Sequence, residues 1–333
     1  MELSYWEKTS AYANYDVIIV GSGIVGLSTS IFLKKINPDL NVCVVDRGHI
    51  PTGASTKNAG FACFGSLSEL IDDEQSMQPN EVIELVEKRW RGLQLLKQLV
   101  NKDTIEYENN GGYELFTEQD ELLYRNCLDR MDFYNSELNK IIGENVYSEY
   151  EGAAKHFGFN NVSHVIYNDY EAQLNPVLLI KELSSHASSL GVTLLNGLNV
   201  DAIQKLKNGV EVICNDNLII KGRIATVCTN GFAEKLLPNL NVEAHRAQVL
   251  ITYPVPQHKL KGVFHYDKGY YYFRNIGERI LIGGARNADF DKEQTDSFGI
   301  TDTIQNKLES LLKETIIPGI PFTVDQRWSG IMG

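Results

Sequence analysis

The sequence predicts an α/β protein with mainly parallel strands near its start and mainly antiparallel strands towards its end. Four β-branched residues at 17–20 precede a group of glycines and an apolar segment of helical spacing, which is typical of a buried strand that turns into a helix. From residue 247 onward, short alternating strands joined by turns indicate an antiparallel sheet. A chain of 333 residues is long enough for two domains.

Composition and charge narrow the functional classes. Hydrophobic residues make up 43% of the chain and charged residues 22%, as in a globular protein. The formal net charge of -12, without a stripe of Lys and Arg, predicts no nucleic-acid partner. The five cysteines are widely spaced and form no Cys-x-x-Cys pattern, so we expect no disulfide, which fits a cytoplasmic protein. The histidines lack the spacing of metal ligands, so we expect no metal site. The apolar stretch 17–33 holds three glycines and lacks a preceding basic segment, so we expect no targeting or transmembrane segment.

The first strand and helix carry a phosphate-binding pattern. Gly21 permits a tight turn, Gly23 lets the main chain approach a pyrophosphate, and Gly26 lets the helix pack closely on the strand. A second apolar strand at 42–45 ends in Asp46, where a carboxylate can accept both hydroxyls of an adenosine ribose. The pattern predicts a bound dinucleotide; the alternative is a plain βαβ unit with an acidic strand end.

The remaining elements follow in chain order. The segment 53–66, rich in small residues and hydroxyls, suits a close approach of main-chain N–H groups to a ligand, with a surface loop as the alternative, and Ser55 could cap a helix. Helices are expected at 80–101, 118–142, 175–190 and 303–313. Strands are expected at 107–116 (two around a turn), 192–195, 200–203, 209–213, 218–220, 224–228, 248–253, 262–266, 270–274 and 279–284. The return of parallel-type strands after a long interval suggests that one domain interrupts another.

These motifs resemble the FAD-dependent oxidoreductases of the D-amino-acid oxidase and glycine oxidase group, whose relatives include sarcosine and γ-glutamylputrescine oxidases. The Gly-Ala-Ser-x-x-Asn-Ala-Gly stretch at 53–60 is the most specific feature, because the glycine pattern alone would also fit nicotinamide enzymes. The resemblance continues through Asn175-Pro176 and the motifs at 227–231, 246–250, 269–274, 281–286 and 328–330.

The resemblance implies two domains. One is a Rossmann-like, glutathione-reductase-like FAD-binding domain of residues 1–75, 160–236 and 322–333. The other is an α+β substrate domain of residues 76–159 and 237–321 with a mainly antiparallel sheet. Together with the glycine pattern, the resemblance implies an FAD site made of Gly21, Ser22, Gly23, Ile24, Val25, Gly26, Asp46, Arg47, Ser55, Thr56, Asn58, Ala59, Gly60, Phe61, Val200, Cys228, Thr229, Asn230, Trp328, Gly330 and Ile331.

The resemblance also implies the reaction. A small amine or amino-acid substrate would give up a hydride to flavin, the resulting imine would hydrolyse, and oxygen or a carrier would accept the electrons. No dedicated catalytic acid or base is expected, and a homo-oligomer is possible. Tyr270 falls at the position of the family's substrate tyrosine, and strand alternation places Tyr272 and Arg274 on the same face.

Two departures from the family pattern stand out. Met332 occupies the position of the arginine that holds the substrate carboxylate, which favours a neutral or amine substrate or an arginine from elsewhere, such as Arg274. The sequence ends at Gly333, where relatives continue with a flavin-contacting segment, so we expect either a fragment or incomplete FAD binding. The alternatives are a non-catalytic flavin-binding protein and a nicotinamide-dependent dehydrogenase.

Overall fold

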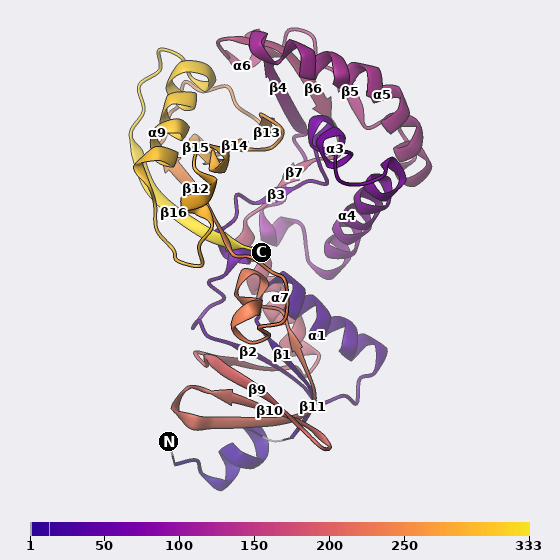
Figure 1. The fold of residues 1–333 in the computed structure, drawn as a ribbon, viewed down its shortest axis with the longest axis vertical. Coiled ribbons are helices and arrows are strands. Elements are labelled where there is room, and N and C mark those ends of the chain that lie inside the picture. The colour runs from indigo at the N-terminus through magenta and orange to yellow at the C-terminus, as the bar shows by residue number, and fades with distance from the viewer. Residues whose placement is uncertain (1, 13) are drawn as a thin grey trace.

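The computed structural model describes residues 2–12 and 14–333 and is built around two large sheets. Figure 1 shows a six-stranded sheet in the lower part of the molecule, an eight-stranded sheet in the upper part, and the C-terminal residue between them. Within the described residues, no helix combines the length and apolar character needed to cross a membrane. The mixed parallel and antiparallel α/β architecture confirms the predicted fold class.

The six-stranded sheet has the order β8-β2-β1-β11-β10-β9. Its first four strands are parallel neighbours: β8 (Thr193–Asn196), β2 (Val42–Asp46), β1 (Tyr15–Val20) and β11 (Leu218–Val227). The antiparallel strands β10 (Gly209–Cys214) and β9 (Val200–Leu206) extend it.

Both faces of this sheet are covered, which explains the unbroken apolar run of β1. Val17 and Ile19 pack with helices α1 (Ile24–Ile36) and α7 (Pro176–Ser189), while Ile18 and Val20 pack with residues of β10 and β11. The segments 218–220 and 224–228, expected as two strands, form the single strand β11. Its first half pairs with β10 and its second half with β1, a pairing between distant segments that no local pattern reveals.

The eight-stranded sheet has the order β16-β12-β15-β14-β13-β4-β6-β5. Neighbouring strands are antiparallel except β13 and β4, which are parallel. The strands are β16 (Val324–Met332), β12 (His245–Thr252), β15 (Arg279–Gly284), β14 (Tyr271–Ile276), β13 (Val263–Tyr266), β4 (Gly112–Thr117), β6 (Val162–Asn168) and β5 (Tyr147–Glu149). The strand β4 corrects the two strands expected at 107–116, because Glu108 makes only an isolated bridge to Gln173.

Two groups of helices pack with strands of the larger sheet, each in its own hydrophobic core. Phe264 and Phe273 pack with α6 (Ala153–Phe157) and α9 (Asp302–Leu311) in one core. Helices α3 (Leu67–Asp73), α4 (Pro79–Leu99) and α5 (Glu121–Ile142) share another. The helices expected near 80–101, 118–142, 175–190 and 303–313 are confirmed. The short elements are α2 (Ala54–Lys57), β3 (Phe61–Ala62), β7 (Ala172–Gln173), α8 (Phe290–Glu293), the π-helical turns Glu7–Ala11 and Leu312–Ile316, and the 3-10 turns Asp103–Ile105, Glu118–Asp120, Asn215–Asn217, Asn230–Lys235 and Arg286–Ala288.

The domain division remains our proposal, and sheet membership suggests two adjustments to it. Strand β6, within the range 160–236, and strand β16, within 322–333, both belong to the eight-stranded sheet rather than to the six-stranded one. We therefore place both strands with the substrate domain.

Candidate functional site

A large pocket lies where β1, β2 and β11 end. It has a volume of about 1050 Å³ and is lined by the turns after these strands and by the first turns of α1 and α2. The carboxyl ends of parallel strands are the usual ligand-binding edge of such a sheet. The local folding of each turn decides what this pocket can hold.

Two glycines allow the chain to turn from β1 into α1. Gly21 has a φ of +104°, and a Cβ atom there would lie 2.5 Å from the carbonyl oxygen of Cys228. A Cβ atom on Gly26 would lie 1.9 Å from the carbonyl oxygen of Gly21. Any side chain at either position would therefore push the helix away from the strand. The close packing aims the N-terminal end of α1, with its positive dipole end, into the pocket.

Asp46 is fixed at the end of β2 by two main-chain donors. The Ser22 N–H donates to Oδ2 at 2.8 Å, and the Gly48 N–H donates to Oδ1 at 2.9 Å. Each carboxylate oxygen keeps acceptor capacity beyond these bonds. Because Asp46 lines the pocket, it can accept hydroxyl groups of a sugar there.

Ser55 caps α1 rather than its own short helix. Its Oγ accepts the Ile24 N–H at 3.0 Å, so the 53–60 segment is tied to the glycine turn. Two further hydroxyls, Ser22 Oγ and Thr229 Oγ1, are buried without a hydrogen-bond partner in the described part of the chain. Unpaired buried hydroxyls, a helix N-terminus and a sugar-binding carboxylate together fit a dinucleotide.

Most residues of the expected FAD site lie around this pocket. Its lining includes Gly21, Gly23, Ile24, Val25, Asp46, Arg47, Ser55, Asn58, Val200, Cys228, Thr229, Asn230 and Ile331. Ser22 and Gly26 belong to the glycine turn but are not part of the pocket lining. Thr56 is not part of the lining either, and its hydroxyl donates to the Pro51 carbonyl at 2.9 Å. Phe232 and Lys235, in the 3-10 turn after β11, also line the pocket and were not predicted from the sequence, although they closely follow the 229–231 motif.

The other expected residues lie where the 57–61 segment meets the larger sheet. Trp328 Nε1 donates to the carbonyl oxygen of Lys57 at 2.9 Å, and a Cβ atom on Gly330 would lie 3.3 Å from the Lys57 Cβ. Ala59 is buried in the same cluster as Trp328. The ring of Phe61 makes edge contacts with Tyr272 and His265, at centroid distances of 5.8 and 5.5 Å.

The strand register explains why this face of the larger sheet is polar. Tyr272 on β14 lies opposite His265 on β13, and His265 lies opposite Glu114 on β4. Arg274 follows two residues after Tyr272, so the shared face expected for these two residues is confirmed. Phe264 and Phe273 alternate with these residues and point into the core on the other face.

A buried acidic cluster surrounds His265. Its Nε2 lies 2.8 Å from Glu171 Oε2, and its Nδ1 lies 3.6 Å from Glu69 Oε1. Burial alone would lower the pKa of His265, but the charges of Glu171 and Glu69 outweigh it and hold this pKa well above its usual value. Glu114 lies beside them, and burial raises its pKa to about 7. These residues come from α3, β4, β13 and the loop before β7, so no sequence motif links them.

The three expected substrate residues do not form one group. Arg274 is only 6% exposed; its Nη1 lies 3.5 Å from the Gly60 carbonyl oxygen, and its Nε has no partner among the described residues. Burial lowers the pKa of Arg274 to about 10. Tyr270 lies in the turn before β14, with its ring 5.8 Å from that of Phe290. Met332 lies near the end of β16, where it pairs with His245 and is 40% exposed.

Solved structures of several other proteins share this fold. The structure matches glycine oxidase from Bacillus cereus with a TM-score of 0.70 at 19% identity, covering 96% of this chain and 82% of that one. It matches iminodiacetate oxidase from Chelativorans sp. with a TM-score of 0.71 at 18% identity, covering 95% and 83%. The match to L-α-glycerophosphate oxidase from Mycoplasma pneumoniae, solved with FAD bound, has a TM-score of 0.68 at 16% identity and covers 96% and 83%.

Curated relatives match over shorter parts of their own length. The thiamine thiazole synthase of Yarrowia lipolytica is 40% identical over 55 residues, 16% of this chain and 17% of that protein. The bifunctional protein ThiO/ThiG of Nostoc sp. is 25% identical over 293 residues, 82% of this chain and 40% of that protein. The chain thus spans well under two thirds of these relatives. A family model for FAD dependent oxidoreductases matches residues 16–333. The chain belongs to this family of FAD-dependent oxidoreductases, the DAO family.

Proposed function

We propose that this protein oxidises the CH–NH bond of a small amine or amino acid to an imine, which water then hydrolyses. The observation that carries the proposal is the pocket at the ends of β1, β2 and β11, joined through the 57–61 segment to a polar face of the larger sheet. Because the chain belongs to a family of FAD-dependent oxidoreductases, the cofactor is FAD. Bound FAD provides the acceptor for the hydride that leaves the substrate carbon.

The residues of the smaller sheet hold the nucleotide part. The N-terminal end of α1 faces the phosphates, and the Asp46 carboxylate accepts the ribose hydroxyls. Ser55 keeps the 53–60 segment against α1, so that this segment leads from the phosphates towards the larger sheet. Arg274 holds the main chain of that segment at Gly60.

The larger sheet supplies the substrate side. Tyr272 and His265 contact Phe61, which directly follows the segment that approaches the cofactor. His265 keeps its proton because Glu171 and Glu69 flank it, so the imidazolium does not serve as a base for the substrate amine. The chain therefore orients a neutral amine and excludes water rather than abstracting a proton.

Two structural matches support an amino-substituted substrate. Their names give glycine and iminodiacetate as substrates, and both compounds contain the CH–NH unit. The methionine at position 332 favours a second candidate, a flavin-binding protein without amine oxidation, since the family's carboxylate arginine is absent there.

The test begins with the purified full chain and added FAD. We expect yellow protein that keeps its flavin through gel filtration, and anaerobic loss of the flavin absorption when a panel of amines and amino acids is added. Repetition in air, with and without an artificial electron acceptor, separates oxidase from dehydrogenase. A protein that binds flavin but is reduced by no member of the panel would favour the second candidate, and a protein that refuses FAD would refute both.

A further inference from the structure

Two side chains that line the dinucleotide pocket meet across it. Arg47 follows β2, Phe232 lies in the 3-10 turn after β11, and the guanidinium carbon of Arg47 lies 4.1 Å from the ring centre of Phe232. Strand β1 lies between β2 and β11 in the sheet. The contact therefore passes over the end of β1, where the glycine turn begins. We call the pair of Arg47 and Phe232 the clasp.

The ring of Phe232 positions two cations at the pocket. Within residues 2–12 and 14–333, Arg47 makes no hydrogen bond or ion pair, so its contact with the face of Phe232 positions the guanidinium. The ammonium group of Lys235, in the same 3-10 turn and also at the pocket, lies 5.4 Å from the centre of that ring. A cation over the face of an aromatic ring is attracted to it. Contacts that hold Phe232 in place therefore also hold Arg47 and Lys235 at the pocket.

A loop beside the larger sheet, residues 294–300, makes such contacts from outside the pocket. The ring centre of Phe298 lies 6.2 Å from that of Phe232, and Lys57 Nζ lies 5.4 Å from the Phe298 ring centre. Asp296 Oδ2 lies 2.6 Å from Lys235 Nζ. The structure describes all of residues 294–300, and none of them lines the pocket. The loop therefore acts on the pocket wall through protein contacts alone.

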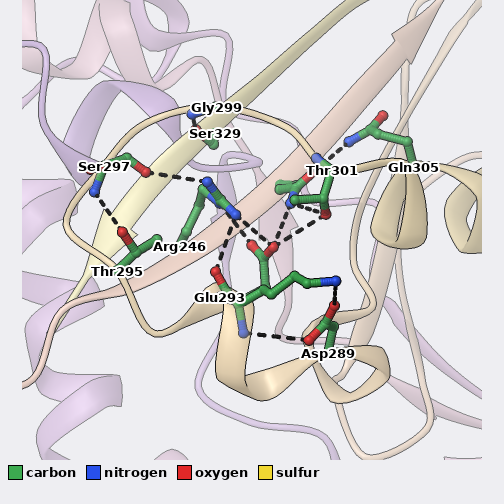
Figure 2. A network of polar contacts seen from close by, with 11 residues as sticks. Arg246, Asp289, Glu293, Thr295, Ser297, Gly299, Thr301, Gln305 and Ser329 are labelled. Carbon is green, nitrogen blue, oxygen red and sulfur yellow. Dashed lines mark hydrogen bonds and ion pairs between the residues drawn. The ribbon is translucent and has the colours of Figure 1, made fainter.

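Both ends of this loop are fixed to β12. Figure 2 shows Glu293 and Thr301 meeting beside Arg246, and the Glu293 side chain is only 1% exposed. Arg246 donates to both Glu293 oxygens, at 3.0 and 2.9 Å. Gln248 Nε2 donates to Glu293 Oε1 at 2.8 Å, and the Thr301 N–H donates to Gln248 Oε1 at 2.9 Å. These buried contacts keep the two ends of the loop in place.

The middle of the loop is held by contacts that face solvent. Phe298 is 45% exposed, and the side chains of Lys235 and Asp296 are 60% and 42% exposed. The Gly299 N–H donates to Ser329 Oγ at 3.0 Å. Exposed contacts of this kind are individually weak, and segments held by them open more readily than the core. Fixed ends and a weakly held middle allow the loop to move away from the clasp and return.

We propose that the clasp of Arg47 and Phe232 closes the dinucleotide pocket, that Asp296 and Phe298 hold it closed, and that its opening limits how fast FAD enters and leaves. The pyrophosphate of a dinucleotide lies at the glycine turn after β1, which the clasp crosses. Because the loop contacts the clasp and not the pocket, weaker loop contacts affect the empty and the FAD-loaded protein alike. The rates of entry and exit then rise together. This inference depends on FAD binding but not on amine oxidation.

The test measures both rate constants of FAD exchange with the full chain. Release is followed by the rise of free-FAD fluorescence after dilution of the FAD-loaded protein, and uptake by its fall when FAD is mixed with the flavin-depleted full chain. Phe298→Ala should raise both rate constants about five- to ten-fold, since it removes an aromatic and a cation–π contact. Asp296→Asn should raise both about two- to five-fold, as expected for an exposed ion pair. The Kd should stay unchanged, because the empty and the loaded protein lose the same contact.

Phe290→Ala provides a matched control. Phe290 is also 45% exposed and lies just before the loop, but its ring contacts Tyr270 and Arg286 rather than the turn after β11. This variant should exchange FAD like the unmodified protein.

A double-mutant cycle shows whether Asp296 acts through Lys235. In a Lys235→Gln background, Asp296→Asn should have no further effect on either rate constant, because the two side chains form one pair. Unchanged exchange rates in both Phe298→Ala and Asp296→Asn would overturn the inference. Faster release with unchanged uptake would also overturn it, since these residues would then stabilise only the loaded protein.

Discussion

Replacing Glu114 by Gln should change how the stability of this protein depends on pH. Glu114 is 3% exposed on the polar face of the larger sheet. It accepts hydrogen bonds from the Ser66 hydroxyl at 2.9 Å, from the Ser68 N–H at 3.2 Å and from the Ser68 hydroxyl. A glutamine has the same shape and no charge to bury: its Oε1 can accept the Ser68 N–H while its Nε2 donates to the hydroxyl oxygens of Ser66 and Ser68.

The expected magnitude follows from the pKa of Glu114. Burial is the main cause that raises this pKa from 4.5 to about 7, with the nearby charge of Glu69 adding to the rise. Between these values the folded state binds a proton that the unfolded state has released, so stability falls as the pH rises. The difference corresponds to about 3 kcal/mol of unfolding free energy, which is reached in full above pH 7.

Urea unfolding at a series of pH values from 4 to 9 tests this reasoning. The stability of Glu114→Gln relative to the unmodified protein should increase by about 3 kcal/mol across the series, because titrating groups that do not interact with Glu114 contribute equally to both proteins. Glu84→Gln, at an exposed position on α4, should show no such trend. A constant difference between Glu114→Gln and the unmodified protein would mean that the pKa of Glu114 is the same in the folded and unfolded states, which would refute the reasoning.

Three further predictions concern the cofactor site and the buried charges. Asp46→Ala should weaken FAD binding at least ten-fold in equilibrium dialysis, because the ribose loses its acceptor, whereas Asp39→Ala in an exposed turn should not. Glu293→Leu should lower the urea-unfolding free energy by about 3–5 kcal/mol, since it leaves Arg246 buried without its partner, and a loss below 1 kcal/mol would contradict this. His265→Gln should cost most stability below pH 6.5 and progressively less as the pH rises through the raised pKa of His265; a cost that is independent of pH would show that folding does not raise the pKa of His265.

The parts of the site that could be predicted from the sequence lie within one strand-turn-helix unit and the strand that follows it. The positive φ of Gly21 and the close packing at Gly26 are properties of one strand-turn-helix unit, so the glycine spacing alone indicated where a nucleotide would lie. Asp46 follows from the next strand of the same unit. Of its two main-chain donors, Gly48 lies two residues further along the chain, and Ser22 lies in the turn after β1 of the same unit.

The substrate side could not be predicted in the same way. The polar face depends on the parallel pairing of β13 with β4, whose residues are far apart in the chain. Asp267 and Lys268 have positive φ values and Tyr270 lies in the turn, so β14 begins at Tyr271, and its register with β13 places Tyr272 opposite His265. The acidic groups around His265 likewise come from separate segments, and only tertiary structure brings them together.

The same β13–β4 junction has a consequence for biosynthesis. The larger sheet consists of one block at 112–168 and another at 245–332, with strands of the six-stranded sheet made between them. Until the second block leaves the ribosome, β4 has a bare edge of unpaired N–H and C=O groups, which invites pairing with other chains. Nascent chains that stall near residue 236 should therefore depend on chaperones, while chains that have released β13 should not.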